Sequence, residues 1–346
     1  MVQRRPTIED VAALAGVSIK TVSRVVNREP NVRESTRDKV DRAIAELGYR
    51  PNPSAQNLAS SRARLIVLVY DDPAAYEVPS SGYIINLQEG VLDACRERGF
   101  ELVIHPCNYR DKSVSRDLRE LISQARPSGI VVAPPLSNMQ KIVHVVNESD
   151  TPFVRISAGS IHKGEFSVGT NDREICAEMT EHLASTGHRL IAFIMGNRQH
   201  RAVRERFAGY KEGLERAGLE FSETLVAEGD NSIGSGEECA LRLLRANPRP
   251  TAIFAANDDM AAGVIRIAMQ LGIRVPEDLS VAGFDDISLA RQIFPSLTTI
   301  RQPLREMAHA ASQALIDLSR GHPHAPGLDI IPAAIRLRES TGPAPS

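Results

Sequence analysis

The sequence predicts a chain of two parts: a small all-α unit at the N-terminus, and a larger α/β body that takes up most of the 346 residues. Residues 7–47 contain three segments with apolar residues at helical spacing and with capping residues at their ends. From residue 65 onward, apolar runs of strand length alternate with helical stretches. That alternation is typical of parallel sheets wound by crossover helices.

The first predicted helix starts after Thr7 and ends at Gly16. Thr7 and Asp10 have the spacing of a capping box, in which two side chains satisfy backbone N–H groups at the start of a helix. The apolar residues on one face are Ile8, Val11, Ala12 and Ala15. Glycine is favoured just past the end of a helix because it accepts left-handed backbone angles.

A second helix is expected after Ser18, which is a favourable N-cap residue. Its inward side chains are Val22, Val25 and Val26, and its outward ones are Lys20, Thr21, Ser23, Arg24 and Asn27. A third helix, capped by Ser35 or Thr36 and ending at Gly48, adds apolar residues to the same core: Val40, Ala43, Ile44 and Leu47. Two short helices joined by a tight turn form the arrangement that places a helix in the major groove of DNA.

The charges of the chain are unevenly distributed. Residues 1–64 carry 12 Lys and Arg against 7 Asp and Glu, whereas the rest carries 29 basic and 36 acidic residues. The net charge of −2 therefore combines a basic head with an acidic body. Contact with phosphates requires positive charge at one end only, so this distribution favours DNA binding over a charged bundle that meets only solvent.

These residues, together with motifs in the body, resemble the LacI/GalR (lactose-repressor-like) family of bacterial transcription regulators. The motifs are DVAALAGVSIKTVSRVVN at 10–27, TRDKVDRAIAELGYRPN at 36–52, AANDDMAAGV at 255–264, PEDLSVAGFDD at 276–286, LTTIRQP at 297–303 and LRES at 337–340. The resemblance covers nearly the whole chain. It implies a homodimer on a palindromic operator in double-stranded DNA, because one head reads only one half-site.

The exposed face of the second helix supplies the expected base contacts. Arg24 can pair with guanine, and Lys20 can reach a neighbouring base. Ile19 either touches a thymine methyl group or packs within the head. The full set of DNA-binding candidates is Thr7, Ser18, Ile19, Lys20, Thr21, Ser23, Arg24 and Asn27 in the head, with Asn52, Ala55 and Leu58 beyond it.

Residues 51–63 join the head to the body, and they form either a plain linker or a short helix with Asn52 as N-cap and Pro53 as its first residue. Isolated helices below about 12 residues are marginal in water, so such a helix is expected to need DNA and a partner copy. The resemblance implies a hinge helix that pairs with its twin in the minor groove and inserts Leu58 between base steps.

The predicted strands of the body form two series. The first comprises 65–70, 101–106, 129–134 and 152–157, and the second 190–195, 224–229, 251–257 and 279–286. Two series predict two parallel-sheet subdomains with a cleft between them. The resemblance implies a periplasmic-binding-protein-like body that the chain crosses three times, so that residues 308–319 belong with the first subdomain.

The resulting domain boundaries are expectations from sequence. They are 1–50 for the helix-turn-helix domain, 51–63 for the hinge and 64–340 for the effector-binding and dimerisation domain. Within the last, subdomain 1 is expected at 64–166 and 298–327, and subdomain 2 at 167–297 and 328–342.

In open parallel sheets, ligands bind at the carboxyl ends of the strands, so polar residues there are candidates for an effector site. The candidates are Asp71, Asp72, Ser157, Asn257, Asp285 and Gln302. The resemblance adds Arg204, at the position where family members hold an arginine against the effector. Carboxylate, amide and guanidinium groups make paired hydrogen bonds to vicinal hydroxyls, which suits a sugar. The same side chains can instead cap turns and helices.

The chain has no Trp, so an aromatic platform for a sugar ring would come from Phe or Tyr. The candidates are Phe294, Tyr70, Tyr76 and Tyr83, each of which can instead be packing only. Arg155 lies in an apolar strand, where a charge needs a partner or must reach the cleft. Together with the basic residues Arg198, His200 and Arg201, it leaves open an anionic sugar such as a uronate, as against a solvated basic loop.

Motifs of common enzymes are missing from the sequence. It has no G-x-x-x-x-G-K-[ST] loop, no G-x-S-x-G and no His pair at metal spacing, so neither a cofactor nor a metal is expected.

The 4 Cys residues are far apart, which favours reduced thiols. No run of about 18 apolar residues and no apolar signal core are present, so a cytoplasmic location is expected, at the nucleoid when bound to operator. Residues 339–346 lack the leucine heptads that a tetramer would need.

The predicted function is a sequence-specific, homodimeric regulator, acting as a repressor of carbohydrate-utilisation genes and controlled allosterically by a sugar or sugar derivative. A corepressor-dependent regulator that binds a purine or another small metabolite is the second possibility. A solute-binding protein, or a sugar enzyme with an accessory head, would also combine a sugar site with a parallel-sheet body. The missing export signal argues against the former, and the missing phosphate loop against the latter. The sequence leaves open which effector binds and whether it releases or promotes DNA binding.

Overall fold

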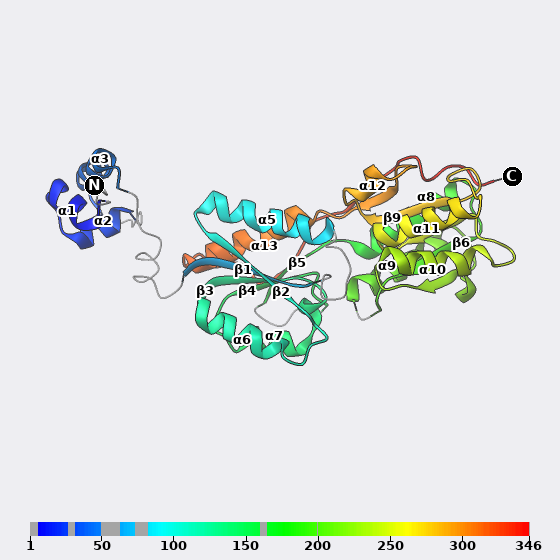
Figure 1. Cartoon of the computed structure of the whole chain (residues 1–346), viewed down its shortest axis with the longest axis horizontal. Coiled ribbons are helices and arrows are strands. Elements are labelled where there is room, and N and C mark those ends of the chain that lie inside the picture. The colour runs from blue at the N-terminus through cyan, green and yellow to red at the C-terminus, as the bar shows by residue number, and fades with distance from the viewer. Residues whose placement is uncertain are drawn as a thin grey trace. The chain divides into compact units, whose positions relative to one another are not determined.

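The computed structural model describes residues 6–26, 32–49, 63–72, 82–159, 165–198 and 200–345. By its internal contacts the chain divides into two compact units, Met1–Ala63 and Arg64–Ser346, which we call the head and the body (Figure 1). The predicted positions Asn27, Asn52, Ala55, Leu58 and Tyr76 lie outside the described residues, as does the expected hinge helix.

The head consists of α1 (Ile8–Ala15), α2 (Ile19–Val26) and α3 (Glu34–Leu47). The capping box is confirmed, because Thr7 N donates to Asp10 Oδ2 at 2.7 Å and Thr7 Oγ1 accepts from Asp10 N at 3.4 Å. Gly16 and Gly48 end their helices with φ of 67° and 62°, as predicted. Ser18 Oγ accepts from Thr21 N at 3.1 Å, so the second cap is confirmed too.

The predicted start of the third helix was wrong. α3 begins at Glu34, so that Ser35 and Thr36 lie within its first turn. Arg33 is the N-cap, and it contributes no side-chain cap hydrogen bond. Its carbonyl accepts from Thr36 N and Arg37 N at 3.0 Å, so the extended backbone of Arg33 itself starts the helix.

The three helices enclose one small apolar core. Its buried members are Val11, Ala12, Val22, Val25, Val40 and Ala43, as the helical spacing predicts. On α2, Lys20 and Arg24 are both exposed, and Ile19 is 49% exposed rather than part of the core. The second helix therefore presents a mostly polar face with one apolar side chain.

The body contains two sheets of six strands each. The first has the order β11-β5-β4-β3-β1-β2. These strands are β1 (Ala63–Asp71), β2 (Glu101–Cys107), β3 (Pro127–Val132), β4 (Phe153–Ile156), β5 (Phe166–Gly169) and β11 (Gly327–Ile330). Its helices are α5 (Gly82–Arg98), α6 (Val114–Ala125), α7 (Gln140–Asn147) and α13 (Leu304–Ser319), with the 3-10 turn η2 (Leu136–Asn138) before α7.

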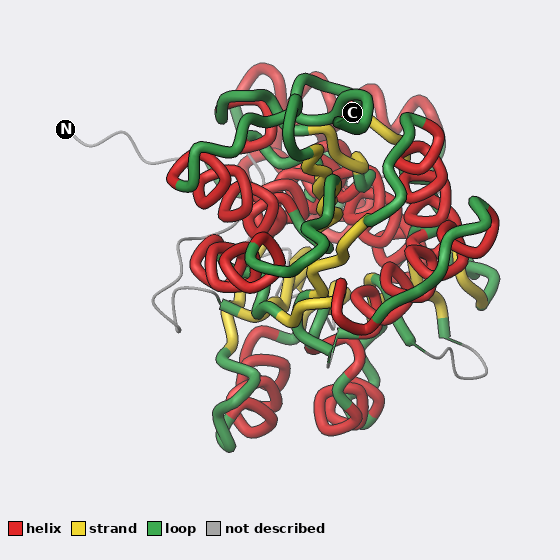
Figure 2. The backbone as a smooth tube through the Cα atoms, turned by 90° about the vertical axis from the view of Figure 1, so that its right-hand side faces the viewer, coloured by secondary structure: helices red, strands yellow, loops and turns green. Residues whose placement is uncertain are grey.

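Alternate residues of β1 pack on opposite faces of this sheet. Ile66 and Leu68 join the apolar cluster that α5 and α13 supply, whereas Val67 and Val69 join the one that α6 and α7 supply. Helices thus cover both faces, and strands lie between helices in the body as a whole (Figures 1 and 2). Because both faces are buried, the strand reads as a continuous apolar run.

The second sheet has the order β12-β10-β9-β8-β6-β7. Its strands are β6 (Ile191–Met195), β7 (Val226–Glu228), β8 (Ala252–Ala255), β9 (Ser280–Asp285), β10 (Thr298–Arg301) and β12 (Ala334–Arg336), of which β12 runs antiparallel to β10. Its helices are α8 (Asp172–Ser185), α9 (Arg201–Arg216), α10 (Ile233–Leu244), α11 (Asp258–Gln270) and the short α12 (Leu289–Gln292), with the 3-10 turn η3 (Glu223–Leu225) before β7.

All eight predicted strands are present, and the chain crosses between the sheets three times. The crossings lie between β5 and α8, between β10 and α13, and between β11 and β12. The expected boundaries need correction, because 166–169 and 327–330 pair within the first sheet and 298–301 within the second. These short strands are defined by partners distant in sequence. The helix expected to return to the first subdomain is α13, which packs on α5.

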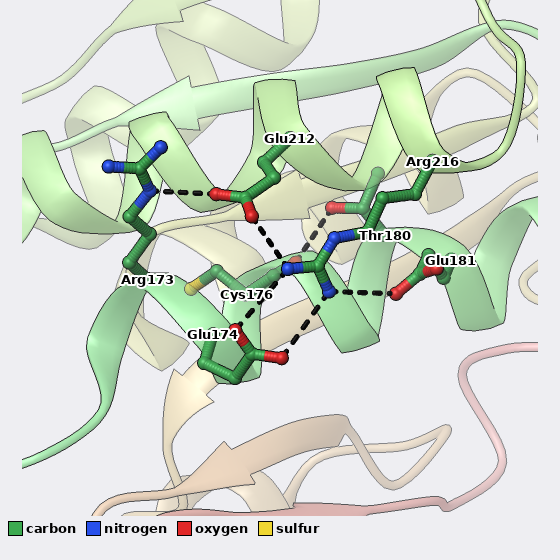
Figure 3. A network of polar contacts seen from close by, with 7 residues as sticks. All are labelled: Arg173, Glu174, Cys176, Thr180, Glu181, Glu212 and Arg216. Atoms are coloured by element: carbon green, nitrogen blue, oxygen red, sulfur yellow. Dashed lines mark hydrogen bonds and ion pairs between the residues drawn. The ribbon is translucent and has the colours of Figure 1, made fainter.

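Helices α8 and α9 approach closely because glycines face the neighbouring backbone. A Cβ atom on Gly209 would lie 2.1 Å from the carbonyl oxygen of Arg173, and one on Gly213 would lie 2.6 Å from that of Ala177. At the surface of the same helix pair, Glu212 accepts from Arg173 at 2.7 Å and from Arg216 at 2.6 Å (Figure 3). The pair therefore forms a fixed support for side chains at the start of both helices.

Candidate effector cavity

A cavity of about 220 Å³ lies where carboxyl ends of strands from both sheets of the body meet. Five of the predicted effector residues line it: Asp71, Ser157, Asn257, Asp285 and Gln302. They lie at or just after the ends of β1, β4, β8, β9 and β10. The structure thus brings together side chains that are far apart in sequence, at the edge where open α/β sheets bind ligands.

Three other candidates do not line this cavity. The backbone N–H of Asp72 bonds to the carbonyl of Cys107 at 2.8 Å, which continues the edge of the sheet. Phe294 is 80% exposed, so it is no platform for a ring inside the cavity. Arg204 is exposed on α9 and its Nη1 donates to the carbonyl of Arg198 at 3.0 Å.

The arginine that reaches the cavity from α9 is Arg206, two residues beyond the predicted one. Successive residues of a helix are about 100° apart, so positions 204 and 206 point to different sides of α9. Arg206 shares the buried face of α9 with Val203 and Tyr210. The apolar spacing of that face was the available signal for a buried arginine.

Arg206 is extensively bonded within the protein. Its Nε donates to Asp172 Oδ1 at 2.9 Å, and its Nη1 donates to the carbonyl of Ala256 at 2.7 Å. Its Nη2 donates to Gln302 Oε1 at 3.2 Å. The guanidinium therefore joins the first crossing, at Asp172, to the second, at Gln302.

Asp285 lies beside this guanidinium but is not hydrogen-bonded to it. Its Oδ1 is 3.7 Å from Arg206 Nη1, and it is buried with no hydrogen-bond partner within the described residues. Burial raises the pKa of Asp285 to about 7, against the opposing effect of Arg206. A buried acceptor without a donor is favourable only if a ligand or water supplies one.

Several cavity residues hold left-handed backbone angles that side chains rarely adopt. Ser157 has φ of 50°, Asn231 has φ of 77° and Asp285 has φ of 116°. Such conformations are unfavourable by about 1–3 kcal/mol each and cluster at functional sites. Ser157 Oγ, like Asp285 Oδ1, is buried without a hydrogen-bond partner among the described residues.

Asn257 has a structural role in addition to its place at the cavity. Its Oδ1 accepts from Met260 N at 3.0 Å, which caps α11, and its Nδ2 donates to the carbonyl of Asn231 at 2.9 Å. Asp258 beside it is fully buried and accepts from Ile287 N and Thr299 Oγ1. Burial raises the pKa of Asp258 well above its usual range.

Two aromatic side chains line the cavity, Tyr83 from α5 and Tyr109 after β2. Asn197, which follows β6, donates its Nδ2 to Tyr109 Oη at 3.3 Å and so bridges the two subdomains. Tyr70 instead packs in the core of the first subdomain. Tyr109, Asn197 and Asp230 were not among the predicted residues, although each lies two residues after a strand and obeys the strand-end rule that supplied the candidates above.

The basic residues that suggested an acidic ligand are largely paired. Arg155 is buried, forms an ion pair with Glu165 and donates to the carbonyl of Ser137 at 2.9 Å. Arg198 pairs with Glu228, and Arg201 pairs with Glu205 at 3.5 Å. His200 is different, because it lines the cavity and burial lowers its pKa to about 4.

The described residues offer no group of three or more His, Cys, Asp or Glu side chains that could hold a metal ion. Nor does the described part of the chain contain a helix long and apolar enough to span a membrane.

Two family descriptions match the chain: "Bacterial regulatory proteins, lacI family" at residues 7–52, and "Periplasmic binding protein-like domain" at 180–341. The HTH-type transcriptional repressor PurR of Vibrio vulnificus is 31% identical over 92% of this chain and 93% of its own. A solved CelR–cellobiose complex has a TM-score of 0.73 at 32% identity, covering 97% of this chain and 100% of that one. A lac repressor dimer bound to operator and an anti-inducer has a TM-score of 0.78 at 30% identity, covering 98% and 100%.

The chain therefore belongs to the lacI family of bacterial regulatory proteins. It is a DNA-binding transcription regulator with a helix-turn-helix head and a periplasmic-binding-protein-like body.

Proposed function

We propose that this regulator is a homodimeric repressor whose DNA binding is controlled by a sugar or sugar derivative in the cavity of the body. The observation that carries the proposal is the meeting of Asp71, Ser157, Asn257, Asp285 and Gln302 with Arg206 around one cavity. Carboxylate, amide and guanidinium groups bind vicinal hydroxyls in pairs. The CelR–cellobiose complex, which is similar over nearly the whole chain, supports a sugar.

In the head, we propose that the outer face of α2 reads bases, with Arg24 against guanine and Lys20 beside it. Thr7, Ser18, Thr21 and Ser23 are assigned to phosphate contacts and to the caps that hold the helices. Arg24→Ala is expected to weaken operator binding by about 1–3 kcal/mol and to relax preference at one symmetric position. Selection of sites from random DNA measures this, and an unchanged preferred site in the variant rules the assignment out.

The dimer follows from the geometry of operators, because one head reads one half-site and two-fold symmetry matches a palindrome. Sedimentation of the full chain at micromolar concentration, with and without a palindromic operator, tests it. A monomer that binds one half-site with full affinity is incompatible with the proposal.

The effector is tested by thermal unfolding of the full chain against a panel of sugars and purines, followed by operator binding with each compound that stabilises it. A stabilising sugar that weakens operator binding supports a sugar-released repressor. A purine that strengthens operator binding supports instead a corepressor-dependent regulator, which the similarity to PurR favours. Loss of the response in Arg206→Lys, with the response kept in Arg204→Lys, assigns the effect to the cavity.

A further inference from the structure

The charges around the cavity are unbalanced. Among the described residues that line it, four carry carboxyl groups, Asp71, Asp230, Asp259 and Asp285, against the guanidinium groups of Arg110 and Arg206. His200 adds no positive charge at neutral pH, because burial lowers its pKa to about 4. The described part of the lining is therefore acidic.

The two guanidinium groups are already engaged with protein atoms. Arg206 donates to Asp172, to the carbonyl of Ala256 and to Gln302. The Nε of Arg110 donates to Tyr109 Oη at 3.3 Å. Arg198 and Arg201, which the sequence offered for an acidic ligand, pair with Glu228 and Glu205.

Burial changes the pKa of two of these carboxyl groups. Burial raises the pKa of Asp259 to about 6 and that of Asp285 to about 7. Near pH 7 Asp259 is therefore mostly ionised and Asp285 about half ionised. A further negative charge placed beside the ionised carboxylates meets repulsion, and the low local dielectric makes that repulsion stronger than in water.

Two buried polar atoms in the cavity lack hydrogen-bond partners within the described residues, Ser157 Oγ and Asp285 Oδ1. The carboxylate oxygen needs a donor, and the hydroxyl can donate or accept. Hydroxyl groups of a ligand satisfy both, whereas a carboxylate or phosphate group placed against Asp285 provides acceptors only and leaves the ionised Asp285 oxygen unsatisfied.

We propose that the effector of this regulator carries no anionic group: the cavity selects uncharged, hydroxyl-rich molecules and rejects phosphorylated and carboxylated sugars. This inference rests on the proposed control by a sugar. The acidic lining, the engaged guanidinium groups and the two unpartnered buried oxygens all support it.

The test uses the full chain and matched sets of compounds: glucose, galactose, mannose and cellobiose, each beside its 6-phosphate and its uronic or aldonic acid. Thermal unfolding and calorimetric titration measure binding, and fluorescence anisotropy measures operator release. A neutral sugar is expected to bind at least about tenfold more tightly than its anionic partners. An anionic compound that binds as tightly as its neutral parent overturns the inference but leaves sugar control intact. A response to no compound in any set overturns both.

A double variant and a control variant test whether the carboxylates of the lining cause the preference for neutral compounds. Asp71→Asn with Asp259→Asn removes two carboxylates from the lining, and it is expected to reduce the preference for the neutral compound about tenfold. Asp278→Asn is the matched control, because Asp278 pairs with Arg274 outside the cavity. An unchanged preference in the double variant overturns the electrostatic argument. Asp259→Asn alone gives the same comparison if the double variant does not fold.

Discussion

The guanidinium of Arg206 lies 3.5 Å from the centre of the Phe284 ring. Phe284 is fully buried in the core of the second sheet, and Asp285 follows it at the end of β9. The charge of Arg206 therefore packs on an apolar ring, while its N–H groups bond Asp172 and Gln302. Cation–π contact and hydrogen bonds together make a buried cation acceptable beside the cavity.

We expect Arg206→Met to lower the free energy of unfolding by about 3–5 kcal/mol, because removal of one partner leaves buried carboxyl groups uncompensated. Arg204→Met, in the same helix, is expected to change it by no more than about 0.5 kcal/mol, since Arg204 is exposed. Urea unfolding of the full chain, followed by circular dichroism, measures both. Similar losses in the two variants would show that burial does not distinguish them.

The close packing of α8 against α9, the helix that carries Arg206, depends on glycine. We expect Gly209→Ala to destabilise the body, because the new Cβ atom would lie 2.1 Å from the carbonyl oxygen of Arg173 and 2.9 Å from Cys176 Cβ. The better helix propensity of alanine, about 1 kcal/mol, is too small to offset separation of the helices.

Gly234→Ala is the matched control for this change. Gly234 is exposed in the first turn of α10, and a Cβ atom there meets nothing within 4 Å. The substitution is expected to raise the melting temperature by the propensity gain alone. A rise in both variants would contradict the close packing of α8 on α9.

Local signals in the sequence were sufficient for much of the fold. Thr7, Gly16, Ser18 and Gly48 act within one or two turns of themselves, so their roles as caps followed directly from spacing. The eight apolar runs also identified their strands, and for central strands such as β1, β3 and β9 the reason is burial on both faces, which leaves a continuous apolar segment. The strands that were missed, such as β10 and β12, are defined by pairing with each other across distant sequence.

The cavity was predictable where a rule tied a residue to a strand end, as for Asp71 and Asp285. Tyr109 lies two residues after β2 and obeys the same rule, but the rule was applied to carboxylate, amide and hydroxyl-bearing Ser side chains, so this aromatic residue was missed. Arg206 is an intermediate case. The spacing of Val203 and Tyr210 marks its side of α9 as buried, but the family resemblance, which rests on motifs outside this helix, placed the arginine at 204 instead.

Acid is expected to destabilise the folded chain through His200. Burial lowers its folded-state pKa to about 4, whereas an unfolded histidine has a pKa of about 6.5. Between these values the unfolded chain binds a proton that the folded chain does not, so stability falls as pH falls from about 6.5 to about 4. Urea midpoints at pH 7 and pH 5 should differ less for His200→Gln than for the natural chain. His322→Gln, an exposed control, should leave the difference unchanged, and a slope unaltered by His200→Gln would count against its burial.

Asp285→Asn tests the opposite dependence of stability on pH at the same cavity. The folded-state pKa of Asp285 is raised by burial to about 7, above the value of about 3.9 for an unfolded aspartate. Its contribution to stability is therefore fully present below about pH 3.9 and is lost as pH rises through 7. Asparagine does not titrate, so the variant should gain stability relative to the natural chain between pH 5 and pH 8.

The control for this last change is Asp278→Asn. Hydrogen bonds from Arg274 hold the pKa of Asp278 well below its usual range, so its contribution changes only in stronger acid. The difference between that variant and the natural chain should be constant between pH 5 and pH 8. Urea unfolding at both pH values distinguishes the two variants. If Asp285→Asn showed the same constant difference, the Asp285 carboxyl would be ionised throughout this range, and burial would not be raising its pKa beside the cavity.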